Sequence, residues 1–152
     1  LNLHDVTLLS TSFSDLCKEN DIKLMAAAPL SMGLLTPGDP PSWHPAPAEL
    51  KERCKRATTL CEEANVSLPH LATIYALAIE EIPCTLLGVK NSLELERMLQ
   101  ASRSLKEVEG FAFNGDVEGL PLTPTEVKVL QALIGRRDIF GGIVRDTGWK
   151  EV

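Results

Sequence analysis

Apolar residues recur at three- and four-residue steps in five segments of the chain, the spacing that places them on one face of a helix. In the first segment the inward face would hold Phe13 and Leu16, and in the fourth it would hold Leu95, Met98 and Leu99. The predicted helices cover residues 5–18, 48–64, 68–82, 91–104 and 123–135.

Three of these helices begin at recognisable capping residues. Ser67 precedes the third helix, with Pro69 in its first turn, and Asn91 precedes the fourth. Thr123, followed by Pro124 and by Glu126 three residues after the cap, forms the pattern of a capping box. These residues fix the predicted starts more firmly than the apolar periodicity does.

Two short apolar runs, residues 22–28 and 84–89, lie between the helices and predict buried strands. Strands that alternate with helices pair in parallel through right-handed crossovers, so the fold class is α/β. Two strands do not make a stable sheet alone. We therefore expect further strands upstream of Leu1.

A long loop with six prolines joins the first strand to the second helix over residues 29–48. Loops of this length are either functional or disordered, and Trp43 and His44 in its middle favour an ordered one. The tail over residues 136–152 is predicted to be a surface excursion.

Net charge, apolar content and cysteine spacing exclude several classes of binding partner. The chain has 152 residues, a net charge of −6 and a pI near 5.1, which argues against a nucleic-acid or membrane-surface partner. We expect no signal peptide, and no apolar stretch approaches about 20 residues. Four cysteines without a C-x-x-C pair predict reduced core thiols and a cytoplasmic location. No metal-ligand spacing is present, so no metal is expected.

The two strand-to-loop junctions carry the candidate chemistry, because loops at the carboxyl ends of parallel strands build active sites. After the first strand, Pro29 directs the loop and Gly33 permits close backbone approach. After the second, Gly88 gives clearance and Lys90 adds a positive charge beside a helix N-terminus, a phosphate-binding arrangement. The alternatives are a plain turn at the first junction and an exposed lysine beside an ordinary N-cap at the second.

Together the two junctions resemble a known family. The run Ala26-Ala27-Ala28-Pro29-Leu30-Ser31-Met32-Gly33-Leu34 resembles the Ala-Tyr-Ser-Pro-Leu-x-x-Gly segment on the seventh strand of aldo-keto reductases. The run from Leu86 to Leu95 is similar to their eighth strand and nucleotide-binding helix. Residues 29–36 and 40–46 are similar to the L-galactose dehydrogenase-like branch, which oxidises free aldoses at C1 with a nicotinamide cofactor.

The resemblance implies the C-terminal portion of a (β/α)8 TIM barrel, with the last two strands and their helices plus a C-terminal helical extension. It covers residues 1–105 as barrel and residues 106–152 as the extension. The family's catalytic Asp, Tyr, Lys and His come from the first half of the barrel, so no catalytic residue maps onto this chain. Tyr75 is predicted to lie in the core.

The resemblance also implies a cofactor site for NAD or NADP. Its predicted residues are Pro29, Leu30 and Ser31 beside the pyrophosphate, Gly88, Val89, Lys90 and Asn91 near the adenosine phosphate and ribose, and Glu94 on the nucleotide helix. Trp43 and His44 would form part of the sugar pocket.

Several positions depart from the family pattern. Ala27 replaces the aromatic residue that stacks on nicotinamide, and Ala28 replaces a serine. On the nucleotide helix, Glu94, Arg97 and Met98 replace residues that contact adenine and phosphate in many members. Glu94 would repel a 2′-phosphate, which favours NAD over NADP.

The resulting hypothesis is a fragment of an NAD(P)-dependent sugar dehydrogenase that carries part of the cofactor site and is inactive alone. Its partners would be a sugar substrate in the intact protein and the missing N-terminal half of the barrel. The alternative is a non-catalytic half-barrel that docks to a partner, or a truncated product without activity.

Overall fold

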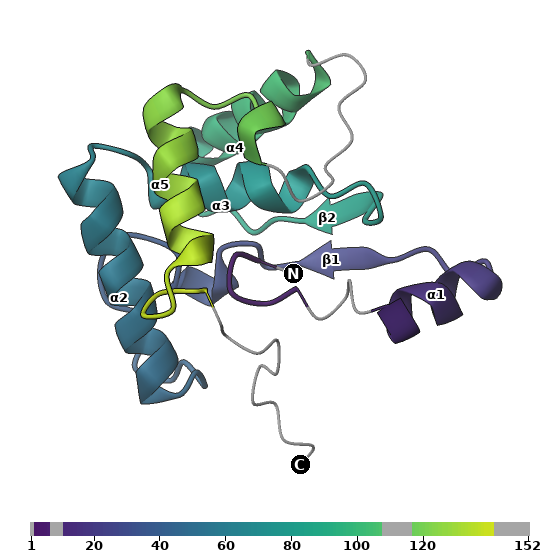
Figure 1. The fold of residues 1–152 in the computed structure, drawn as a ribbon, viewed down its shortest axis with the longest axis horizontal. Coiled ribbons are helices and arrows are strands. Elements are labelled where there is room, and N and C mark those ends of the chain that lie inside the picture. Colours follow the sequence, from purple (N-terminus) through teal and green to yellow (C-terminus); the bar gives the residue numbers. More distant parts are fainter. Residues whose placement is uncertain (1, 7–10, 108–116, 142–152) are drawn as a thin grey trace.

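Two short parallel strands form the centre of the fold (Figure 1). The computed structural model describes residues 2–6, 11–107 and 117–141. Strand β1 (Met25–Ala27) pairs with β2 (Cys84–Leu86), with Met25 opposite Cys84 and Ala27 opposite Leu86. The predicted parallel pairing is confirmed, although each strand is shorter than the apolar run that predicted it.

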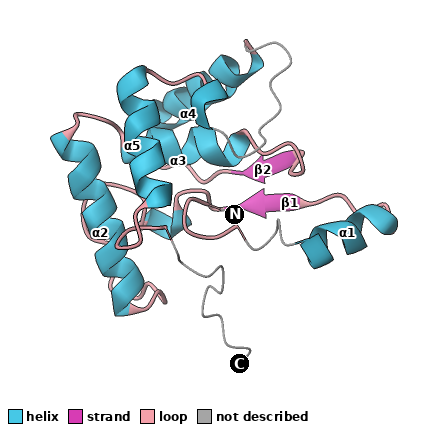
Figure 2. Ribbon diagram, in the orientation of Figure 1, coloured by secondary structure: helices cyan, strands magenta, loops and turns pink. Residues whose placement is uncertain are grey.

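The described residues form five α-helices besides the two strands (Figure 2). Helices α2 to α5 gather on one side, beyond the carboxyl ends of the strands and over β2, whereas α1 stands apart beyond the start of β1 (Figure 1). Two 3₁₀ turns, Ser31–Gly33 and Val117–Gly119, complete the elements. The helices are α1 (Thr11–Glu19), α2 (Ala48–Glu63), α3 (Leu68–Leu77), α4 (Ser92–Lys106) and α5 (Pro124–Gly135).

The three predicted caps are confirmed by their hydrogen bonds. The Ser67 and Asn91 side chains accept the backbone N–H groups of His70 and Glu94. Thr123 and Glu126 form a complete capping box at the start of α5. Each cap satisfies a backbone donor that has no partner inside the helix, so the helices begin where these residues stand.

The main hydrophobic core lies between α2, α3, α4 and α5. Leu35, Leu71 and Leu130 are fully buried there, and cysteines 54 and 61 pack with them. A smaller cluster packs Ala26 of β1 against Ala76, Ile79 and Ile82 of the α3 region. Tyr75 packs against both clusters, in agreement with its predicted core position.

The strands are not buried as predicted, because only one of their faces is covered. Ala26 is 1% exposed beneath α3, whereas Met25 and Leu86 are 64% and 63% exposed. Side chains alternate between the two faces of a strand, so a strand covered on one side leaves every second residue open. Cys84 is exposed for the same reason, although the other three cysteines are buried as predicted.

The prediction that certain helix residues face inward is also wrong in part. Leu16 is 56% exposed, and Leu95 and Leu99 are each 45% exposed, although Met98 between them is buried. The first helix also starts later than predicted: residues 2–5 form a turn in which Asn2 and Asp5 exchange backbone hydrogen bonds. Residues 7–10 of the predicted first helix lie outside the described residues.

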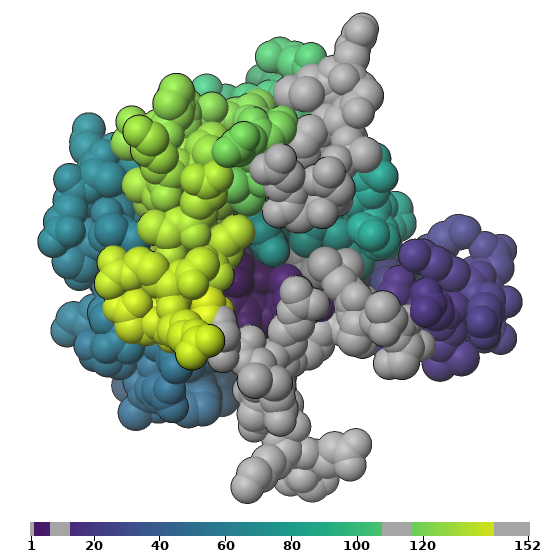
Figure 3. All heavy atoms as spheres, viewed as in Figure 1, coloured from purple at the N-terminus to yellow at the C-terminus, as the bar shows by residue number. Residues whose placement is uncertain are grey.

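The described part of the tail is not a surface excursion. Ile139 and Phe140 are buried at 1% and 6% exposure, and Arg53 of α2 donates to the carbonyl oxygens of Arg137 and Ile139. Figure 3 shows these yellow residues beside the purple N-terminal residues. The rest of the predicted excursion, residues 142–152, lies outside the described residues.

The core does not separate at residue 105. Val129, Leu130 and Leu133 of α5 belong to the same cluster as residues of α2 and α3. The division into barrel and extension therefore stays a prediction. Within the described ranges, no helix combines the length and hydrophobicity that crossing a membrane requires.

Candidate functional site

A groove of about 680 Å³ lies at the carboxyl ends of the two strands. Its walls come from the loop that follows β1 and from the loop that follows β2, which are about 60 residues apart in the chain. Six predicted cofactor residues line it together: Pro29, Leu30, Gly88, Val89, Lys90 and Glu94. Trp43, predicted to contact the sugar, lines the same groove.

The wall after β1 is a tight, strained loop. Ala28, Ser31 and Met32 all have φ near +50°, the left-handed region that residues with a Cβ rarely adopt. The turn is held by Ser31 N–H donating to Ala28 O at 2.8 Å, and by Gly33 N–H donating to Leu30 O at 3.1 Å. Pro29 is fully buried beneath it. The sharp turn brings Leu30, Met32 and Gly33 into the groove wall.

The wall after β2 is open and carries the charged groups. A Cβ added at Gly88 would meet no atom within 4 Å, so the backbone is accessible from the groove. Val89 is 44% exposed, Lys90 is exposed, and Met98 of α4 lies buried behind them. This wall therefore combines an accessible backbone, an apolar surface and one cation.

Glu94 and Asn91 are engaged at the start of α4. Asn91 Oδ1 accepts the Glu94 N–H at 2.9 Å, and Glu94 Oε2 accepts the Lys90 N–H at 2.8 Å. Asn91 is thus the helix cap, and it is absent from the residues that line the groove. The Glu94 carboxylate does line the groove, at the helix end where the dipole favours negative charge.

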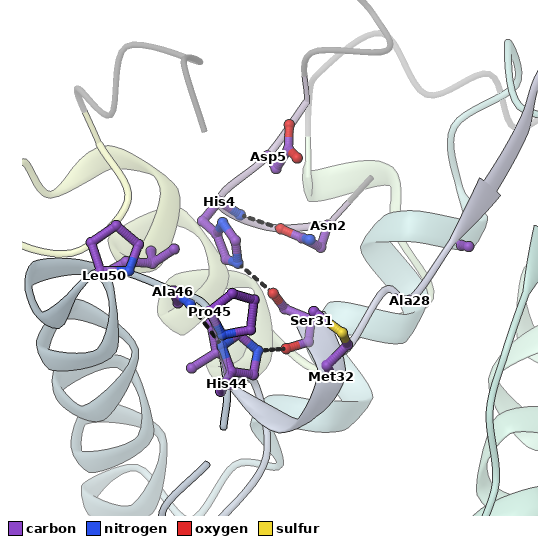
Figure 4. Close-up of a pocket in the computed structure, with 13 residues that line it drawn as sticks. Asn2, His4, Asp5, Ala28, Ser31, Met32, His44, Pro45, Ala46 and Leu50 are labelled. Carbon is purple, nitrogen blue, oxygen red and sulfur yellow. Dashed lines mark hydrogen bonds between the residues drawn. The ribbon is translucent and has the colours of Figure 1, made fainter. Parts of the chain in front are cut away.

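Ser31 lies apart from the other predicted cofactor residues. It is buried and lines a neighbouring cavity of about 280 Å³ behind the loop (Figure 4). Its hydroxyl is 2.9 Å from Nε2 of His4, and its carbonyl oxygen is 3.1 Å from Nε2 of His44. The hydroxyl and the carbonyl group of Ser31 therefore both have partners inside the protein.

Trp43 and His44 point into different cavities. Trp43 is 68% exposed in the groove, whereas His44 is buried in the cavity behind the loop. His44 Nδ1 accepts the Ala46 N–H at 3.1 Å, so in the neutral ring Nε2 carries the hydrogen and donates to Ser31 O. Both ring nitrogens of His44 therefore have partners inside the loop, and a contact with the sugar stays a prediction.

His4, which precedes the first predicted helix, was not among the predicted site residues. Burial lowers the pKa of His4 to about 4, so the ring is neutral near pH 7. The ring lies 5.9 Å from that of Phe140. No local sequence signal identifies such a residue, because its partners are 27 and 136 positions away.

A third cavity, of about 560 Å³, adjoins the groove between α3 and α4. Lys90, Glu94 and Met98 line both, and Arg97 and His70 add basic groups to the third cavity. His70 Nε2 is also 3.8 Å from the carboxylate of Glu126, which ties α3 to α5. Across the described ranges, acidic, histidine and cysteine side chains do not cluster in threes or more as a metal site needs.

Comparisons with known proteins agree with this geometry. The sequence model of the Aldo/keto reductase family matches residues 3–110, which include both groove walls. L-galactose dehydrogenase of Arabidopsis thaliana is 36% identical over 91 residues, covering 60% of this chain and 28% of that protein. D-arabinose 1-dehydrogenase of Saccharomyces cerevisiae is 35% identical over 102 residues, covering 65% of this chain and 30% of that protein. The chain thus matches less than a third of the length of either relative.

Proposed function

Because the chain belongs to the aldo/keto reductase family, we propose that it forms the nucleotide-binding part of a nicotinamide-dependent sugar dehydrogenase. The observation that carries the proposal is the groove at the strand ends. It gathers six predicted cofactor residues from two distant segments onto the facing walls of one groove.

The chemistry of the groove suits the adenosine diphosphate half of a dinucleotide. The Lys90 ammonium is the cation on its wall, and the accessible backbone at Gly88 allows a phosphate to approach closely. The exposed surfaces of Val89 and Trp43 offer apolar contact to an adenine ring. In this proposal the chain binds and orients the cofactor, whose nicotinamide would supply the hydride acceptor for a sugar.

We further propose that the cofactor is NAD rather than NADP. The Glu94 carboxylate faces the groove from the start of α4, where a 2′-phosphate on the adenosine ribose would meet a like charge. Arg97 and His70 line the adjoining cavity, which shares Lys90, Glu94 and Met98 with the groove.

The remaining strands of the barrel would cover the open faces of β1 and β2. Met25 and Leu86 are exposed on those strands, and Leu16 is exposed on α1. Apolar side chains gathered at unpaired strands mark a contact surface. We propose that the catalytic groups and most of the sugar pocket come from that part of the barrel, and that the protein acts in the cytoplasm.

Calorimetric titration of the purified chain tests the proposal. ADP and ADP-ribose should bind saturably and with similar affinity, whereas nicotinamide mononucleotide should show no saturable heat. The chain should also produce no NADH from NAD and L-galactose, because the family's catalytic groups are predicted to lie in the first half of the barrel.

Two results would overturn the proposal. Absence of binding by every adenine nucleotide would remove the nucleotide site and favour a non-catalytic half-barrel that only docks to a partner. Sustained NADH production by the chain alone would show that its own side chains complete an active site.

A further inference from the structure

We propose that His4 and His44 are positioning residues that hold Ser31 from two sides and thereby set the shape of the groove wall. The inference rests on the proposed nucleotide site, because the wall in question is the one formed by residues 28–33. Neither histidine lines that groove. Both line the cavity behind the loop (Figure 4).

The two histidines engage different groups of the same residue. His4 shares a hydrogen bond with the Ser31 hydroxyl at 2.9 Å, and His44 donates to the Ser31 carbonyl oxygen at 3.1 Å. In Figure 4 the two rings approach Ser31 from the N-terminal segment and from the proline-rich loop. Two segments outside the loop therefore add to the loop's own bonds, from Ser31 N–H to Ala28 O and from Leu34 N–H to Ser31 O, in fixing the position of Ser31.

The loop needs such support because its backbone is strained. Ala28, Ser31 and Met32 occupy the left-handed region within five positions, and none of them is glycine. Strained backbone persists only where the surrounding contacts hold it. Because Ser31 and Met32 are successive left-handed residues, contacts on the hydroxyl and the carbonyl oxygen of Ser31 restrain the centre of the strained turn.

Each histidine is itself held in place. The Ala46 N–H donates to His44 Nδ1, and the Lys51 ammonium donates to the His44 carbonyl oxygen at 2.8 Å. The His4 N–H donates to Asn2 Oδ1, and the His4 ring packs near Phe140. The supports of the loop thus come from the start of α2, the N-terminal turn and the segment after α5.

The consequence appears on the opposite side of the loop. Leu30, Met32 and Gly33 line the groove, while Ser31 between them is anchored behind it. Loss of an anchor should let the turn relax toward ordinary backbone angles and move these three residues. The histidines would therefore control nucleotide affinity without touching the nucleotide.

The test compares nucleotide binding and loop order in matched variants. His4→Phe keeps a ring beside Phe140 but removes the hydrogen bond, and His44→Leu removes both ring nitrogens. Each should weaken ADP binding at least fivefold. His44→Gln restores a donor for the Ser31 carbonyl and should recover most of the affinity. Ser31→Ala, a small change that keeps both rings, should resemble His4→Phe.

Thr123→Ala is the control for general loss of stability. It removes the cap of α5, away from the groove, and should leave the ADP dissociation constant within twofold of the wild type. Equal ADP affinity in the wild type, His4→Phe, His44→Leu and Ser31→Ala would overturn the inference. So would equal weakening in His44→Gln and His44→Leu, because the lost donor would then not be the cause.

Amide hydrogen exchange separates this inference from the proposed function. Exchange at residues 31–35 should accelerate in His4→Phe and His44→Leu but not in Thr123→Ala, whether or not any nucleotide binds. A wild-type chain that binds no nucleotide would refute the proposed function alone. Unchanged exchange at residues 31–35 in both histidine variants would refute the positioning role.

Discussion

The carboxylate of Glu94 accepts the backbone N–H of Lys90 at 2.8 Å, so an acidic and a basic residue are joined at one wall of the groove. The bond holds the carboxylate at the start of α4 and leaves the Lys90 ammonium exposed. A nucleotide in the groove would therefore meet a cation and an anion at neighbouring positions. Their separate effects on affinity are measurable.

Glu94→Gln should raise affinity for NADP and leave affinity for NAD nearly unchanged. The amide oxygen still accepts the Lys90 N–H, but the like charge near a 2′-phosphate is gone. Removing one such repulsion at a partly exposed site is worth about 1 kcal/mol, or roughly fivefold in the dissociation constant. Calorimetric titration with both dinucleotides measures it.

Glu96→Gln is the matched control for Glu94, since it removes the same charge from an exposed position of α4 outside the groove. It should alter neither dissociation constant by more than about twofold. An equal gain in NADP affinity in both variants would assign the effect to net charge rather than to Glu94.

Lys90→Met should weaken ADP binding by about threefold at low salt, and the difference should shrink as salt rises. The side chain is exposed, so its attraction for a phosphate is modest and screened. Lys106→Met, at the other end of α4, should bind ADP like the wild type. Calorimetric titrations with ADP at a low and a high salt concentration measure these differences. Identical affinities for the wild type and Lys90→Met at low salt would exclude a contact between Lys90 and a phosphate.

Acid should destabilise the chain partly through His4. Burial lowers the folded-state pKa of His4 to about 4 from an unfolded value near 6.5. As the pH falls from about 6.5 to 4, the unfolded chain takes up this proton first. The stability that neutral His4 contributes above pH 6.5 is therefore lost across that window, by roughly 2–3 kcal/mol.

Urea unfolding at a series of pH values between 7.5 and 4 measures this loss. His4→Phe, which cannot take up the proton, should lose less stability over the same window than the wild type, whatever its stability at pH 7.5. Parallel pH profiles for the two proteins would mean that His4 has an ordinary pKa in the folded chain.

Local signals explain which parts of the fold were predictable. Ser67, Asn91 and Thr123 cap their helices through hydrogen bonds to residues three positions away. The caps can therefore be predicted from the local sequence. The burial of Met25 and Leu86 was predicted wrongly, because an apolar strand residue is buried only if another element covers its face. That information is not local to the strand.

The candidate site also has a part that the sequence predicts and a part that it does not. Pro29 and Gly88 follow strands that pair in parallel, so their meeting at one groove follows from topology. Ser31 belongs to the same motif as Pro29, yet left-handed backbone angles turn it into the cavity behind. Its partners His4 and His44 lie in other segments, and no spacing rule connects them.

Mapping amide chemical shifts in an isotope-labelled chain during titration with ADP locates the nucleotide site on the sequence. Saturable shifts should concentrate at residues 30–36 and 87–94, the two walls of the groove, with little change in α1 and α2. Saturable shifts centred elsewhere, or no saturable shifts at millimolar ADP, would contradict the proposed nucleotide site.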